Sequence, residues 1–166
     1  MTTTQSDVQT NFKNVMAGVA TPVSIVTTLF EDRPYGTTVS AFTSLSMDPP
    51  MVLVSLDRGS ETLEFVRESG LFGLNILGSQ QARTALAFAK KGGIGKFHGT
   101  PWELDTGLPR IPTSPTWLAC TVENLVDGGD HVIVLGNVTS ADTTGGNPLI
   151  YCRRLFGTYL QHDHNS

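Results

Sequence analysis

The chain begins with an amphipathic pattern of helical period. Five apolar residues recur on one helical face, namely Val8, Phe12, Val15, Met16 and Val19. Ser6 with Gln9 three residues later has the form of a capping box, so we expect a helix to begin near Ser6. Gly18 and Pro22 then end this helix.

Short β-branched or apolar runs dominate the rest of the chain and predict strands. The predicted strands are residues 22–30, 35–42, 51–56, 72–77, 117–125, 131–141 and 148–160. Residues 31–34 form a four-residue turn between the first two strands, and the glycine-containing residues 126–130 join 117–125 to 131–141. The run 51–56 is almost wholly apolar, which is typical of a central strand.

Two further helices and one irregular segment complete the pattern. Ser60 precedes a helix over 61–68, and Ser79 precedes a helix over 80–90 that ends at a glycine pair. Residues 92–116 are rich in glycine and proline, with Trp102 as their one large anchor. Strands in consecutive hairpins predict a mainly β fold, an antiparallel barrel with a few helices packed outside it.

Length and charge limit the classes of function. The 166 residues predict one domain over 1–166, with 1–6 and 161–166 as flexible tails. A net charge of −4 without a dense basic run argues against a nucleic-acid partner. No signal peptide or membrane-spanning run is visible, so we expect a soluble, cytoplasmic protein. Cys120 and Cys152 would pair or stay free, and a reducing cytoplasm favours free thiols.

Several familiar catalytic motifs are missing. The chain has no GxGxxG after a strand and no GxSxG, and residues 92–97 lack the spacing of a phosphate-binding P-loop, although Lys96 lies there. His98 and His131 lack ligand spacing, and His162 and His164 lie in a polar tail, so no metal site is expected.

A hydroxyl-rich segment, residues 37–46, is the strongest positive feature. A strand with small polar groups on one face would offer hydroxyl and backbone donors to a flat heterocycle. The same pattern suits a half-buried strand whose polar face contacts water. The residue pattern leaves both interpretations open.

The chain resembles the flavin reductase family, the small partners of two-component flavin-dependent monooxygenases. The main segments that carry the resemblance are Tyr35-Gly36-Thr37-Thr38-Val39-Ser40-Ala41-Phe42-Thr43-Ser44-Leu45-Ser46, Asp48-Pro49-Pro50 and Val52-Leu53-Val54-Ser55-Leu56-Asp57-Arg58. Shorter matches follow in order at 72–77, 96–97, 102, 129–131, 136–138 and 148–151. Together they extend from about residue 12 to residue 159.

The resemblance implies a split β-barrel that forms a homodimer and binds FMN or FAD near the subunit interface. The flavin-binding positions it implies are Thr37, Thr38, Val39, Ser40, Ser55, Leu56, Asp57, Arg58, Ser60, Thr62, Lys96 and Phe97. Thr37 to Ser40 would lie at the isoalloxazine edge, Ser55 and Leu56 at its pyrimidine side, and Asp57 to Thr62 near the phosphates. His131 would border the nicotinamide, or it would only bond its own hairpin loop.

The implied reaction is hydride transfer from NADH or NADPH to FAD or FMN, after which reduced flavin leaves for a separate oxygenase. This chemistry belongs to the two cofactors and requires no catalytic acid or base from the chain. The chain departs from the family at Gly59, where a hydroxyl residue is common, at Glu61, where a basic residue is common, and at residues 153–157, where a shorter Arg-Gly-aromatic ending is expected. The alternatives are a non-catalytic flavin-binding protein, a pyridoxamine-phosphate oxidase-like enzyme on the same barrel, and a barrel without ligand.

Overall fold

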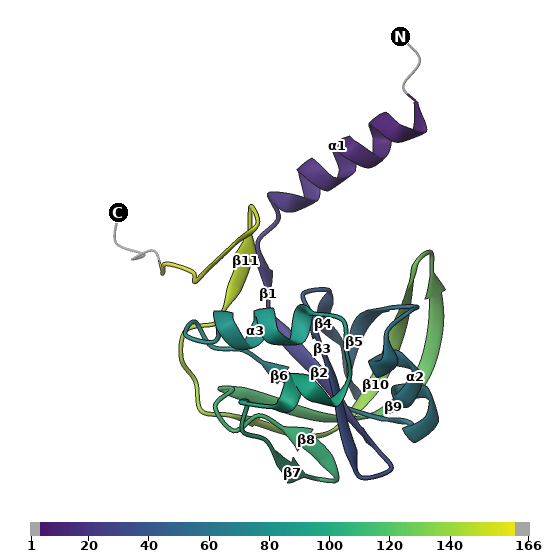
Figure 1. Cartoon of the computed structure of the whole chain (residues 1–166), viewed down its shortest axis with the longest axis vertical. Helices are drawn as coiled ribbons and strands as arrows, with labels where there is room; N and C mark the ends of the chain where they lie inside the picture. The colour runs from purple at the N-terminus through teal and green to yellow at the C-terminus, as the bar shows by residue number, and fades with distance from the viewer. Residues whose placement is uncertain (1–3, 162–166) are drawn as a thin grey trace.

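The computed structural model describes residues 4–161, and antiparallel strands are the main secondary structure of this part of the chain (Figure 1). Its helices are α1 (Gln5–Ala17), α2 (Glu61–Ser69), α3 (Ala82–Ala89) and the 3-10 helix η1 (Ile94–Phe97). The predicted mainly β, antiparallel architecture with flanking helices is confirmed. His162 and His164 lie outside the described residues.

A seven-stranded sheet forms the body of the molecule. In spatial order its strands are β3 (Arg33–Val39), β2 (Ser24–Phe30), β6 (Leu71–Ile76), β9 (Thr116–Gly128), β10 (His131–Thr143), β5 (Pro50–Asp57) and β4 (Phe42–Met47). All of its neighbouring strands pair antiparallel. β3 and β4 are therefore consecutive in sequence but occupy opposite edges of the sheet, and residues 40–41 carry the chain from one edge to the other.

Two small sheets extend from this body. β1 (Thr21–Pro22), β11 (Ile150–Cys152) and β12 (Leu155–Gly157) form one, and β7 (Glu103–Asp105) with β8 (Leu108–Arg110) forms the other. β1 and β11 lie at the base of α1, which projects away from the main sheet in Figure 1. No helix within residues 4–161 is long and apolar enough to cross a membrane.

The structure corrects several predicted boundaries. The first helix begins at Gln5, because Thr4 and not Ser6 is its N-cap. Thr4 Oγ1 accepts a hydrogen bond from the Asp7 amide, and the Asp7 carboxylate accepts one from the Thr4 amide, which makes the capping box. Thr4 to Ser6 thus belong to the helix and its cap, where a tail was expected.

Tight turns account for further corrections. Glu31 and Asp32 both have positive φ, as a two-residue type I′ turn requires, so the first hairpin has two loop residues and not four. Arg153 and Arg154 also have positive φ and form a second two-residue turn. This turn divides the predicted strand 148–160 into β11 and β12. The predicted helix 80–90 begins only at Ala82, since Gln81 and not Ser79 is its N-cap.

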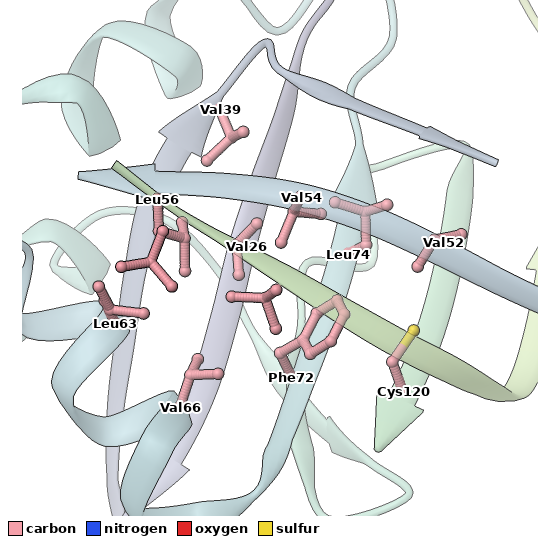
Figure 2. Packing of buried hydrophobic residues seen from close by; sticks show 12 residues of the cluster. Val26, Val39, Val52, Val54, Leu56, Leu63, Val66, Phe72, Leu74 and Cys120 are labelled. Carbon is pink, nitrogen blue, oxygen red and sulfur yellow. The ribbon is translucent and has the colours of Figure 1, made fainter. Parts of the chain in front are cut away.

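The core lies between the sheet and α2. Figure 2 shows the side chains of Val26, Val54, Leu63, Phe72 and their neighbours pointing toward one another from β2, β5, α2 and β6. All four are 0–1% exposed, so each contributes about 1.5–3 kcal/mol through burial. A second cluster, which includes Phe88 and Phe97, lies under α3 and η1.

A buried polar network attaches the β7–β8 hairpin to the sheet. Asn75 on β6 donates to the Ile25 carbonyl and to Thr27 Oγ1, and its Oδ1 accepts from the Ile111 amide at 2.7 Å. Thr27 in turn donates to the Pro109 carbonyl at 2.6 Å. These bonds organise part of the segment 92–116, which has no clear period in the sequence.

Two glycines make room for aromatic rings. A Cβ atom on Gly136 of β10 would overlap the Phe72 ring and lie 3.2 Å from Cys120 Cβ. A Cβ on Gly73 of β6 would overlap the Trp117 ring. Gly136 also adjoins a bulge in the β9–β10 pairing, where the strand bends around the core.

Gly136→Ala should destabilise the protein by about 1–3 kcal/mol, because the added methyl group overpacks the core against Phe72. The melting temperature should fall by roughly 2–4 °C per kcal/mol. Gly157→Ala is the matched control, since nothing lies within 4 Å of its Cβ position. Equal melting temperatures for the two variants, measured by circular dichroism, would contradict the close packing.

Candidate functional site

A pocket of about 400 Å³ opens where β3, the β5–α2 connection and the segment after α3 meet. Its lining residues are Tyr35, Gly36, Thr37, Asp57, Gly59, Ser60, Glu61, Thr62, Ala89, Lys90, Lys91, Gly92, Gly93 and Lys96. This volume lies in the range of small-molecule sites.

The amino end of α2 forms one wall of the pocket. Ser60 is the N-cap of α2, yet its side chain makes no capping hydrogen bond to the helix, so the first amides of α2 are left for another acceptor. Ser60 and Thr62 both line the pocket. A helix amino end presents amide donors and a partial positive charge, which suits an anionic group.

Lys96 also lines the pocket. Lys96 Nζ donates to the Gly36 carbonyl at 3.1 Å and to the Phe88 carbonyl at 3.3 Å, and so joins η1 to β3 and α3. Burial lowers the pKa of Lys96, while the negative charge of Glu61 acts in the opposite direction. The cation is thus held in place beside the pocket.

The structure brings together five of the positions expected to bind flavin. Thr37, Asp57, Ser60, Thr62 and Lys96 all line the pocket, although they come from β3, β5, α2 and η1. Asp57 Oδ1 accepts from the Gly59 amide at 2.7 Å and shapes the turn before α2. The pocket is therefore polar on the side of α2.

Other expected positions lie elsewhere. The side chains of Val39, Leu56 and Phe97 are buried in the two cores, so only their backbone groups remain for a ligand. Thr38 Oγ1 donates to the Ala85 carbonyl at 2.6 Å and ties β3 to α3. Ser40 follows the end of β3.

The Ser55 amide and the Arg58 guanidinium also bond other groups of the protein. The Ser55 amide donates to the Ala41 carbonyl at 2.9 Å. Arg58 turns toward the β9–β10 hairpin, where it bonds the Gly129 carbonyl and pairs with Asp127 at 2.8 Å. Arg58 does not line the pocket described above.

His131 begins β10 and lies directly opposite Asp57 in the β5–β10 register. Its Nδ1 lies 2.8 Å from Asp130 Oδ1, and its side chain is 43% exposed. This bond to Asp130 lies within the hairpin loop, as the alternative interpretation of His131 predicts. The same register nevertheless places His131 beside a residue that lines the pocket.

Sequence reasoning missed a group of pocket residues after α3. Lys90, Lys91, Gly92 and Gly93 line the pocket together with Tyr35 and Gly36. The signal was a pair of lysines directly before a pair of glycines, which the sequence analysis assigned only to a helix end. Lysines at this point also face the carbonyl end of α3, where positive charge is favourable.

The pocket suits binding more than acid–base chemistry. Burial raises the pKa of Cys120 to about 12, which keeps this core thiol protonated and inert. Within residues 4–161, no three histidine, cysteine or acidic side chains gather to hold a metal ion. A helix amino end and a fixed ammonium that line one pocket fit a phosphate-bearing ligand, and Thr37 lines the same pocket.

Comparisons with known proteins agree with this geometry. The family described as flavin reductase like domain matches residues 16–159. The reductase component of a 4-nitrophenol 4-monooxygenase/4-nitrocatechol 2-monooxygenase from Rhodococcus opacus is 38% identical over 91% of this chain and 81% of its own length.

Solved structures show the same fold. A nitrilotriacetate monooxygenase component B homologue from Mycobacterium thermoresistibile superposes with a TM-score of 0.88 at 29% identity, over 98% of this chain and 96% of that chain. A Streptomyces globisporus NADH:FAD oxidoreductase in complex with NAD and FAD fragments gives 0.87 at 26% identity, over 96% and 97%. The expected split-barrel fold is confirmed by these neighbours.

Lys96→Met should lower the stability of the protein by about 1–2 kcal/mol at neutral pH, through the two lost hydrogen bonds. Because burial lowers the pKa of Lys96 in the folded state, the unfolded chain binds more protons as pH approaches the ordinary value of 10.5. The stability advantage of the wild type should therefore grow with pH, as measured by urea unfolding of both proteins.

Lys13→Met, at an exposed position on α1, controls for the loss of a lysine charge. A difference in the free energy of unfolding between the wild type and Lys96→Met that stays constant with pH would mean that Lys96 is not desolvated in the folded protein.

Proposed function

The chain belongs to the flavin reductase-like family, and from this membership we propose the reaction, ligand placement and partners that its pocket supports. The protein is an oxidoreductase that reduces flavin with a nicotinamide nucleotide and supplies reduced flavin to an oxygenase. The bound flavin supplies the hydride-accepting ring, and NADH, the nucleotide named for relatives of this chain, supplies the hydride.

One observation carries the placement of the flavin: the amino end of α2 and the ammonium of Lys96 face the same pocket. Ser60, Thr62 and Lys96 would hold the phosphate, with Asp57 and Arg58 shaping the adjoining turn and hairpin. Phe97 would support Lys96 from the core.

The ring of the flavin would lie along the strand wall. Thr37 offers a hydroxyl that lines the pocket, and the backbones of Thr38, Val39 and Ser40 continue the wall beyond it. Ser55 and Leu56 on β5 would face the pyrimidine edge, where Leu56 can contribute only its backbone because its side chain is 1% exposed. Such neutral contacts hold a planar ring without a fixed charge and permit its release.

His131 is proposed to border the nicotinamide. Its Nδ1 is engaged by Asp130, so Nε2 is the ring nitrogen left for a ligand. The β5–β10 register sets this ring beside Asp57 at the edge of the pocket. In this role His131 orients the nucleotide and transfers no proton.

The reductase components among the relatives imply a separate oxygenase as the recipient of reduced flavin. We place the protein in the cytoplasm, where the free thiols Cys120 and Cys152 would stay reduced.

We also propose a homodimer. None of the side chains of α1 is buried, and Phe12 and Val15 on its apolar face are 63% and 68% exposed. A second copy of the chain would cover this face and bring more surface to an open pocket.

The direct test of the function is oxidation of NADH and NADPH, followed by absorbance with and without riboflavin, FMN or FAD. We expect oxidation that depends on added flavin, with most of the flavin lost during gel filtration. Flavin binding without nucleotide oxidation would instead support the non-catalytic alternative.

His131→Ala should lower kcat/KM for the nucleotide about five- to thirty-fold, equivalent to one lost contact of roughly 1–2 kcal/mol. Flavin affinity and melting temperature should change little, because the His131–Asp130 pair is exposed and such pairs stabilise weakly. Steady-state kinetics, flavin titration and a melt on the one variant separate the two roles. A lower melting temperature with proportional losses for both ligands would make His131 a residue of the hairpin alone.

Phe12→Glu should shift the protein from about twice the 17.8 kDa chain mass toward the mass of one chain in light scattering. A charge on the apolar face of α1 would have to be buried in the dimer without a partner. Thr10→Glu, on the opposite face of the same helix, should leave the mass unchanged. A wild type that elutes as one chain would rule out the dimer.

A further inference from the structure

The pocket is lined by side chains of both positive and negative charge. Three lysines, Lys90, Lys91 and Lys96, line it together with the carboxylates of Asp57 and Glu61. Asp57 is engaged in its own turn, since it accepts a hydrogen bond from the Gly59 amide. The second carboxylate, Glu61, takes no part in the hydrogen bond that shapes this turn.

Glu61 reaches across the pocket from α2. A Cβ placed on Gly93 would lie 3.2 Å from Glu61 Oε2, so the carboxylate lies against the glycine segment that forms the opposite wall. Among the residues that the structure describes, Glu61 forms no ion pair within 4 Å. Its charge nevertheless reaches Lys96, on which it acts favourably.

The ammonium of Lys96 is held in place by the protein backbone. Two of its donors are committed to the Gly36 and Phe88 carbonyls. A phosphate that approaches Lys96 and the amino end of α2 therefore enters a space that Glu61 also borders. Attraction from Lys96 and the helix end would then be opposed by repulsion from Glu61, and the repulsion grows with the charge on the phosphate.

We propose that Glu61 is a specificity-determining residue that disfavours a compact phosphate dianion and so makes the site prefer FAD to FMN. This inference rests on the proposed flavin site. The terminal phosphate of FMN carries a charge of roughly −1.5 to −2 at neutral pH, as phosphate monoesters do. Each phosphate of the FAD diphosphate carries about one charge, and riboflavin carries none, so the three flavins form a graded series at this position.

The test measures dissociation constants of riboflavin, FMN and FAD by quenching of flavin fluorescence, for the wild type, E61Q and E64Q. Glu64 is the matched control, because it also lies in the first turn of α2 and does not line the pocket. E61Q should bind FMN about four- to fifteen-fold more tightly and FAD about two- to four-fold more tightly. Riboflavin should stay within about twofold, and E64Q should resemble the wild type.

Salt gives a second readout. The increase in FMN affinity caused by E61Q should become smaller as ionic strength rises, because salt screens the repulsion that the substitution removes. Melting temperatures of both variants check the fold, and Glu61→Ala, which also lacks the charge, should reproduce the ranking of the three flavins.

An equal gain for riboflavin would overturn the inference, since Glu61 would then act by its size. An unchanged affinity for FMN, or the same gain in E64Q, would overturn it as well. Binding of all three flavins with the graded response but without NADH oxidation would support this inference and contradict the proposed function. A wild type that binds none of them would overturn both.

Discussion

The site depends on one ammonium group held by two backbone carbonyls. Lys96 donates to Gly36 on β3, which is 60 residues away in sequence, and to Phe88 in α3, which is eight residues away. These bonds hold the segment after α3 against the sheet, and Phe97 beside Lys96 packs edge-on against Phe88 with a ring separation of 4.8 Å. The part of the pocket that Lys96 lines is therefore anchored from the core side, and its charge stays where a phosphate would need it.

The order of the strands explains why the hydroxyl-rich segment contributes little to the pocket. The segment 37–46 does not run as one strand, because the chain leaves the edge strand β3 after Val39 and enters the other edge strand at Phe42. Only Thr37 from this segment lines the pocket. Thr37 thus lies at the pocket, whereas Thr43 and Ser44 lie at exposed positions of β4.

Local patterns predicted the elements that depend on local sequence. Apolar runs and turn residues placed β2, β5, β6 and the β9–β10 ribbon, and Ser60 marked the start of α2. The β7–β8 hairpin escaped prediction because distant bonds organise it, above all Asn75 to the Ile111 amide. In the site, Asp57, Ser60 and Thr62 are close in sequence and lie together at the pocket. The Lys90–Lys91 pair was missed because only the approach of α3 to β3 brings it to the pocket.

The two glycines that receive aromatic rings also constrain how the family's sequences can change. Gly136 faces Phe72, and Gly73 faces Trp117, so in each pair the empty side of one strand is filled by a ring from another. A larger residue at either glycine can be accommodated only when the ring opposite it becomes smaller, and at Gly73 Thr27 Oγ1, 2.7 Å from the Cβ position, must also shift. Across related chains these four positions should therefore covary as two pairs, and a substitution at one member alone should be rare.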